Sequence, residues 1–250
     1  MQKIVFNRFF IIVLALAIPA IFLAQQVPVP KINIGVDSAK TPEDVSLSLQ
    51  IIALLTVLAL APTILILTTA FTRIVIILSF VRTAMGTSSI PPNQVVIGLS
   101  LFLTIYVMAP TYEKVNQSAL QPYFNKEIKL DEALKRAEVP VKAFMTRSTY
   151  QKDLNLFLKL RKEKVKTPKD TSLLTLIPAF IVSELKTAFV VAFYIFVPFL
   201  MVDLVVASIL MSMGMMMLPP TVVSLPAKIL VFSLADGWSM LVSSLMAGYL

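Results

Sequence analysis

The sequence predicts an all-α membrane protein, in which several apolar helices form hairpins and one helical domain lies outside the bilayer. Three observations lead to this fold class. Apolar residues make up 57% of the 250 residues and charged residues only 14%, against roughly 25% charged residues in soluble domains. Several uncharged runs are long enough to span a membrane as helices. The charged residues gather mainly in one polar segment between these runs, which suits a domain in water.

The residue types that are missing exclude most catalytic and metal-binding chemistry. The chain has no cysteine and no histidine, so disulfides, thiol nucleophiles, imidazole-based triads and zinc sites with these ligands are excluded. The phosphate-binding patterns GxxxxGK[ST] and GxGxxG are missing as well. We therefore predict that the protein is not an enzyme and has no catalytic residue, no cofactor and no metal site.

The net charge of +8 does not indicate a nucleic-acid-binding protein. Residues 113–170 contain fourteen Lys and Arg and eight Asp and Glu, a difference of +6 that accounts for most of the total. Nucleic-acid binding would also call for stacking aromatic residues among these charges, and no such pattern is present. We expect a basic extramembrane domain, with membrane lipid and no nucleic acid among the partners.

Residues 1–24 have the layout of a secretory signal peptide. Lys3 and Arg8 precede an apolar run that ends in small residues near Ala24. Phe22 occupies a position where signal peptidases prefer a small residue, which leaves a retained anchor helix as the alternative. Residues 25–46, with three prolines, are then predicted to be an exported, extended tether.

Residues 47–111 are predicted to form two apolar helices joined by a short basic connector. Residues 47–71 are free of charge over 25 positions, more than the roughly 20 that a helical span needs, and Pro62 should kink this helix. The connector carries Arg73 and Arg82 and no acid, which places it on the cytoplasmic side. Residues 95–109 are the second candidate span.

Residues 112–172 are predicted to be a basic helical domain outside the membrane. Pro140 is expected to open its second helix. A buried stripe is expected from apolar residues at helical spacing, namely Phe144, Met145, Leu154, Phe157 and Leu158. An exported N-terminus and a cytoplasmic connector put this domain on the periplasmic side. Its excess of Lys and Arg would favour the cytoplasmic side, but that rule weakens for loops of about 60 residues.

Residues 173–250 are predicted to be the pore-forming region, and their first part is too long for a simple span. Residues 173–218 are almost all apolar, and 46 helical residues would measure about 69 Å, more than twice the ~30 Å of bilayer hydrocarbon. The alternatives are a hairpin, two helices broken near Pro198, or one helix standing partly clear of the lipid. Residues 222–250 form the last apolar segment.

Five charged residues lie inside these apolar segments, namely Glu184, Lys186, Asp203, Lys228 and Asp236. A charge at mid-bilayer costs at least about 2.5–3.5 kcal/mol, so each needs a partner or water. Glu184 and Lys186 are two residues apart and point to different sides of a helix, which makes Lys228 the expected partner of Glu184 in a buried ion pair. The alternative is a proton relay through Glu184, Asp203 and Asp236, as in a secondary transporter.

Methionine is concentrated just before a pair of prolines, in the stretch MGMMMLPP at residues 213–220. Met213, Met215, Met216 and Met217 lie within five residues. Methionine is unbranched and polarizable, so it adapts to irregular or changing neighbours. Ordinary core filling would explain one scattered stripe, but four methionines on all sides of a helix end cannot face one core. We expect them to form a dry, compressible collar if several copies of the chain surround a central hole.

Several long motifs in this region resemble the FliP family of flagellar type III protein export. They are PAFIVSELKTAF (178–189), VPFLMVDLVVAS (197–208), MGMMMLPP (213–220) and LPAKILVFSLADGW (225–238), preceded by FVRTAMGTSSIPPNQVVIGLSLFLTIYVMAP (80–110). The resemblance covers nearly everything from about residue 49 onward except the polar domain. One departure is that Val190, Val191 and Ala192 stand where the family usually has a polar residue, an apolar one and a glycine.

The resemblance implies a structural subunit of the export gate in the bacterial inner membrane, within the flagellar basal body. Proteins of this family form a pentameric ring with FliQ-like and FliR-like subunits, beside other export-gate membrane proteins, and pass unfolded flagellar substrates. The family's methionine gasket corresponds to Met215, Met216 and Met217, and its buried acid and base to Glu184 and Lys228. The alternatives are the related injectisome subunit (SctR) and, from another class, a proton-coupled transporter of small solutes.

Overall fold

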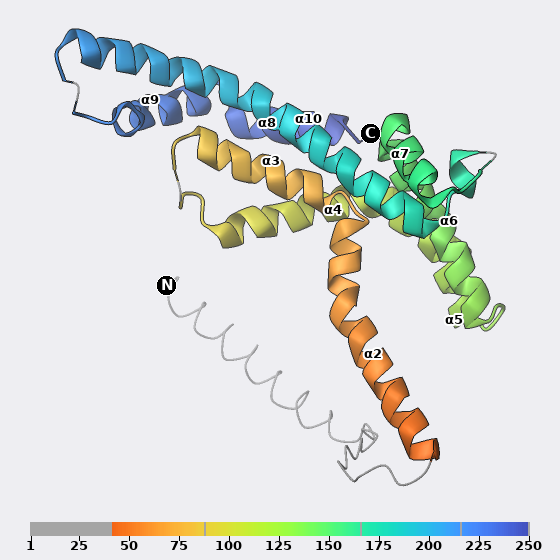
Figure 1. Ribbon diagram of the computed structural model, residues 1–250. Helices are drawn as coiled ribbons and strands as arrows, with labels where there is room; N and C mark the ends of the chain where they lie inside the picture. Colours follow the sequence, from red (N-terminus) through yellow and green to blue (C-terminus); the bar gives the residue numbers. More distant parts are fainter. Residues whose placement is uncertain (1–41, 88, 166, 216, 250) are drawn as a thin grey trace, which may run out of the picture. The chain divides into compact units, whose positions relative to one another are not determined.

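The computed structural model describes residues 42–249 except 88, 166 and 216. The predicted signal peptide (1–24), most of the predicted tether (25–41) and Met216 lie outside the described residues. The chain divides into two units, residues 1–53 and 54–250. Every regular element in the described part is a helix (Figure 1), which confirms the all-α fold class.

Helix α2 spans Pro42–Leu67 and keeps Pro62 inside it. Residues 42–46, assigned to the tether from the sequence, are its first turn. From Leu49 to Ile66 most of its side chains are exposed. Because an exposed apolar helix of this length is not stable in water, its surface indicates contact with lipid or with other chains.

The segment predicted to be a short basic connector contains a helix of the protein's core. Helix α3 spans Phe71–Ala84 and buries Ile74, Ile77, Leu78 and Val81. These positions repeat at three- and four-residue spacing, as expected for one buried helix face. Helix α3 packs against α4 (Asn93–Val115) and against α8.

The boundary expected near residue 111 falls inside a continuous helical segment. Helix α4 passes through Pro110 and continues as a π-helical turn, Asn116–Leu120, into α5, Gln121–Phe124. The basic domain therefore begins on the same helical rod as the second candidate span.

After α5, the polar domain continues with two longer helices and the loop that follows them. Helix α6 spans Leu130–Ser148 and is not interrupted at Pro140, contrary to the expected start of a new helix there. Helix α7 spans Gln151–Arg161, and a short 3-10 turn, Pro168–Asp170, precedes α8. In the predicted stripe, Phe144, Met145 and Leu154 are buried, whereas Phe157 and Leu158 are only partly buried.

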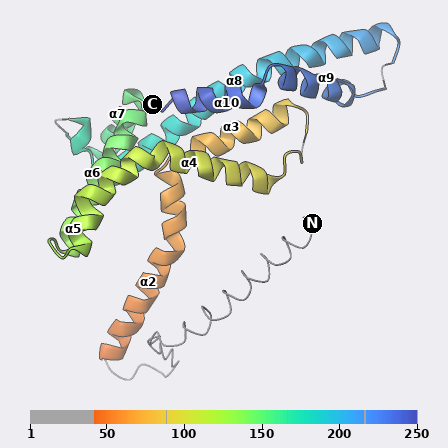
Figure 2. The ribbon, with the colours of Figure 1, turned by 180° about the vertical axis from the view of Figure 1, so that it is seen from behind.

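Helix α8 is one continuous helix over Leu173–Ser212, with Pro178 and Pro198 inside it. Its 40 residues correspond to about 60 Å, which excludes both the hairpin and the break near Pro198. The chain then reverses and returns as α9, Pro220–Leu234, and α10, Gly237–Ala247, with a bend of 63° between these two helices. Figures 1 and 2 show α9 and α10 running back beside α8, with α3 and α4 close by.

Three described helical segments are long and apolar enough to cross a membrane. They are Leu49–Leu67, Asn93–Phe124 and Leu173–Ser212, and the bent pair α9 and α10 makes a fourth if it counts as one span. Length and composition thus agree with a multi-span membrane protein.

Candidate functional site

A buried ion pair joins the first half of α8 to the start of α3. The Arg73 Nε donates to Glu184 Oε2 over 2.9 Å, and Nη2 donates to Oε1 over 2.5 Å. Arg73 is 8% exposed and Glu184 is fully buried. Removing two charges from water costs several kcal/mol per ion, so such a pair persists only with excellent geometry and further hydrogen bonds. The bidentate arrangement supplies that geometry.

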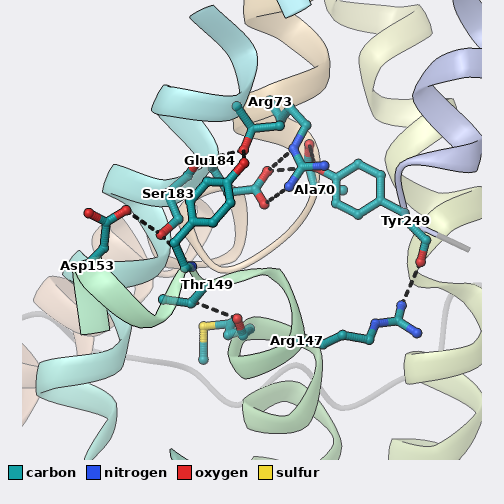
Figure 3. Close-up of polar contacts among 11 residues, drawn as sticks. Ala70, Arg73, Arg147, Thr149, Asp153, Ser183, Glu184 and Tyr249 are labelled. Atoms are coloured by element: carbon teal, nitrogen blue, oxygen red, sulfur yellow. Dashed lines mark hydrogen bonds and ion pairs between the residues drawn. The ribbon is translucent and has the colours of Figure 1, made fainter. Parts of the chain in front are cut away.

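Tyr249, near the carboxyl end of the chain, completes this arrangement, which we call the Arg73–Glu184–Tyr249 cluster. Its hydroxyl donates to Glu184 Oε2 over 2.6 Å, and the Arg73 guanidinium lies 4.1 Å from the centre of its ring. Arg147 on α6 donates to the Tyr249 carbonyl over 2.7 Å. Figure 3 shows these side chains converging from four separate segments. The cluster therefore fixes α3, α6 and the chain end against α8.

A second cluster attaches α7 to α8. Asp153 is 2% exposed; it accepts a hydrogen bond of 2.9 Å from Ser183 and one from Lys186. Burial acts to raise the pKa of Asp153, but the hydrogen bonds from Lys186 and Ser183 and the positive charges of Lys186 and Lys152 outweigh it and lower the pKa. Asp153 is therefore held as a carboxylate.

A third cluster joins α8 to α9 closer to the methionine-rich stretch. Lys228 donates to Asp203 Oδ2 over 2.6 Å, and Ser224 donates to the other carboxylate oxygen. Lys228 is 3% exposed, whereas the Asp203 side chain keeps 19% of its surface. This pair is therefore less isolated from solvent than Arg73 and Glu184.

The described methionines of this stretch follow the end of α8 in a turn, whereas the sequence placed them around the helix end itself. Met213 is the C-cap of α8, and Gly214 has a positive φ of 74°. The amide of Gly214 donates to the Met211 carbonyl and that of Met215 to the Leu210 carbonyl. These two bonds form a Schellman motif, which ends a helix and needs a left-handed residue that glycine supplies at low cost. Met215, Met217 and Leu218 thus project beyond α8.

The described methionines of this turn are exposed to different degrees. Met213 is 64% exposed, Met215 36% and Met217 98%. A Cβ added at Gly214 would have no other residue's atom within 4 Å, so the space around it is open. The rest of the described chain therefore covers little of Met213 and Met217 but more than half of Met215.

The sequence model of the FliP family matches residues 54–245. This chain belongs to the FliP family. A protein of Bacillus subtilis is 56% identical over 217 residues, which cover 86% of this chain and 98% of the relative. A protein of Aquifex aeolicus is 47% identical over 94% of this chain and 97% of its own length, and one of Caulobacter vibrioides is 46% identical over 92% and 85%. All three are named flagellar biosynthetic protein FliP.

The part of the chain that matches the FliP family contains the three pairs and the methionine turn, while Tyr249 lies just beyond it. Within one chain the expected pair of Glu184 with Lys228 is not formed, because Glu184 binds Arg73 and Lys228 binds Asp203. Glu184 and Lys186 do have separate partners, as their spacing requires. Within one chain, the charged residues that the sequence singled out in α8 and α9 therefore pair with Arg73, Asp153 and with one another in a different combination.

Asp236 behaves differently from the other charged residues that the sequence singled out. It is exposed, has a positive φ of 48° at the start of α10, and accepts a hydrogen bond of 3.0 Å from Ser239. The next position requires glycine because the Phe232 ring packs closely against the Gly237 backbone, and a Cβ there would overlap the ring. Asp236 thus belongs to the bend between α9 and α10.

The sequence analysis missed Arg73, Tyr249 and Asp153 as partners of buried charges. Arg73 gave a usable signal, since it begins a run of apolar residues and has no nearby acid in the sequence. Asp153 and Tyr249 gave none, because an acid in a polar helix and a tyrosine near a chain end are ordinary. Across the described residues, no group of three or more acidic side chains is placed to hold a metal ion.

Proposed function

We propose that this protein is a pore-forming structural subunit of the flagellar type III export apparatus in the bacterial inner membrane. Several copies form a ring, together with FliQ-like and FliR-like subunits and further export-gate membrane proteins. Unfolded flagellar substrates pass through this ring. The subunit performs no catalysis and uses no cofactor.

Membership of the FliP family and the name that its relatives carry support the flagellar part of this proposal. The helices that can span a membrane support the location. The relatives' name also favours the flagellar apparatus over the injectisome alternative.

The exposure of the methionine turn carries the pore part of the proposal. Met217 is 98% exposed and Met213 64% exposed in a chain whose core residues are fully enclosed elsewhere. Large apolar side chains at the tip of a helical hairpin indicate a surface that another chain covers. When copies surround a common axis, the flexible thioethers of this turn meet and seal the hole, yet move aside for a substrate.

The transporter alternative finds less support in the contacts of the three acids. Glu184 binds Arg73 and Tyr249, Asp203 binds Lys228 and Ser224, and Asp236 binds Ser239. A proton path requires acids that exchange protons with one another or through water. These acids instead have three separate sets of partners, and two of the sets include a cationic side chain.

A leak measurement tests the collar. We expect the double substitution Met215→Ala and Met217→Ala to make the assembled complex leaky to ions and small dyes in proteoliposomes or in cells. Alanine retains the backbone of the turn but removes the flexible apolar groups that fill the hole. Tightness equal to that of the unsubstituted complex, in a ring assembled to the same extent, would exclude the sealing role.

The control replaces two other exposed methionines, Met201→Ala and Met240→Ala. These side chains are 57% and 56% exposed and lie on α8 and α10, away from the turn. The control complex is expected to stay tight, which separates sealing from a general loss of methionine. The mass and composition of the detergent-solubilised complex test the ring itself, since a monomer that binds a small solute saturably would favour the transporter.

A further inference from the structure

An apolar groove lies between α3, the middle of α8 and the pair α9 and α10. Its volume is about 550 Å³, within the range of roughly 300–1,000 Å³ that is usual for small-molecule sites. The lining is almost entirely apolar and includes Val191, Ile195, Phe199 and Leu241. Two walls belong to helices that qualify as membrane spans.

A second, polar pocket adjoins the groove at the end nearest to α6 and α7. Its volume is about 400 Å³. Three residues line both spaces, Arg73, Thr187 and Gly248, so the groove and the pocket are direct neighbours. The pocket thus lies where the apolar helices meet the polar domain.

The lining of this pocket contains two arginines and no acidic residue. Arg73 is held in the bidentate pair with Glu184. Arg147 is exposed and uses one guanidinium nitrogen for the Tyr249 carbonyl, and a guanidinium has five N–H donors. Most donors of Arg147 therefore remain available for an anion at the pocket's mouth. Ser148 and Tyr150 also line this pocket.

We propose that the groove and the pocket together bind one anionic phospholipid, with an acyl chain in the groove and the headgroup phosphate at Arg147. A molecule that fits must be apolar over most of its length and negatively charged at one end, which describes a lipid such as phosphatidylglycerol. Arg147 then acts as a phosphate ligand through a charge-assisted hydrogen bond. Tyr150 lines the pocket and Tyr194 lines the groove, and both are more than half exposed. Tyrosine is common at the boundary between hydrocarbon and water, which suits this arrangement.

Charge favours this occupant over a helix of a second copy. The exposed candidate span Leu49–Leu67 contains no charged residue, so the same helix of a second copy would bring no acid to the arginine end. A soluble phosphate ion would satisfy Arg147 but would leave the groove open to water. Only a molecule with both parts covers the apolar lining and supplies the negative charge.

The test measures the phospholipid retained by the purified full-length protein. The protein is exchanged into detergent micelles with equal amounts of phosphatidylglycerol and phosphatidylcholine, and native mass spectrometry reports the bound lipid. We expect selective retention of phosphatidylglycerol. Arg147→Gln should weaken it by about tenfold, the factor expected for one lost charge-assisted hydrogen bond. Ser244→Phe, which fills the groove from α10, should abolish it.

Two matched control variants are expected to retain phosphatidylglycerol. Arg161→Gln removes an arginine of α7 that lines neither space, and Ser243→Phe adds the same ring one position away from Ser244. Equal binding of both lipids would overturn the proposal, and so would lipid retention by Ser244→Phe. The natural absence of cysteine allows one further measurement with Ser244→Cys. A disulfide or crosslink from that residue to a second copy would assign the groove to a protein interface instead.

This inference is independent of the proposed export function. Lipid retention is measured on the purified protein and requires no transport, so either proposal can fail while the other stands.

Discussion

The two halves of helix α8 differ in how much of their surface the rest of the chain buries. In the first half, buried residues repeat every three or four positions, and they are Thr175, Leu176, Ala179, Phe180, Ser183, Glu184, Ala188 and Ala192. In the second half only Phe199 and Leu210 are buried. The apolar residues Leu200, Leu204, Val205 and Ile209 are each about half exposed there.

Both halves are apolar in sequence, so composition does not explain the difference. The first half is enclosed by α3, α6 and α7 and carries the two pairs formed by Glu184 and Lys186. The second half meets chiefly α9. Its remaining surface, which ends in the methionine turn, must be covered by lipid or by other chains. The first half thus holds the subunit together, and the second half leaves an apolar surface for lipid or for other chains.

The largest effect is expected from Glu184→Ala in the enclosed half. The substitution leaves the Arg73 guanidinium buried without a counter-charge, which should cost about 3–5 kcal/mol of the unfolding free energy. The measurement is denaturant or thermal unfolding in detergent, followed by the fluorescence of Trp238, the single tryptophan.

A paired control sharpens this contrast. Arg73→Met combined with Glu184→Leu removes both charges and should recover most of the loss, because an apolar pair of similar size is often as stable as a buried ion pair. Met217→Ser in the exposed half should change stability by less than about 0.5 kcal/mol. Equal losses for Glu184→Ala and Met217→Ser would contradict the distinction between the halves.

A smaller effect is expected from Lys228→Met, at the junction of α8 and α9. The Asp203 carboxylate loses its cation but keeps partial access to water and the hydrogen bond from Ser224, so the cost should be about 1–3 kcal/mol. The same unfolding assay measures it. A loss as large as that of Glu184→Ala would mean that this pair is as isolated from solvent as the Arg73–Glu184–Tyr249 cluster.

The smallest effect is a loss of stability in acid, which originates in the polar domain. Hydrogen bonds from Thr175 and from the Ser172 amide lower the pKa of Glu163 below its ordinary 4.5, and the pKa of Asp153 lies below its ordinary 3.8. Since both folded pKa values are depressed, the contribution is complete above the unfolded values and disappears as pH falls through the folded ones.

We therefore expect the unfolding midpoint to decrease as the pH is lowered from about 5 toward 3. The double substitution Asp153→Asn and Glu163→Gln should be less stable at neutral pH and should show a flatter acid limb. An acid limb as steep as that of the unsubstituted protein would assign the acid sensitivity to other carboxylates.

Local patterns in the sequence predicted the fold class and selected most of the site. Long uncharged runs predict helices because a backbone in lipid must satisfy its own hydrogen bonds, and Glu184, Lys186, Asp203 and Lys228 were conspicuous because buried charges are costly. The pattern at residues 72–84 was misjudged, since an apolar stretch with two arginines suits a basic connector as well as a core helix. For residues 173–212 the sequence left a hairpin, a break near Pro198 and one long helix as alternatives, because two prolines do not by themselves decide whether a long helix breaks.

The sequence by itself determined that this chain is helical, that it belongs with membranes, and which few charged and methionine residues are exceptional. Only the tertiary structure decided which charges meet and which apolar surfaces stay open. Arg73 and Glu184 are 111 positions apart, and Tyr249 is 65 positions from Glu184. Contacts over such separations depend on how whole helices pack, and spacing along one helix carries no information about them.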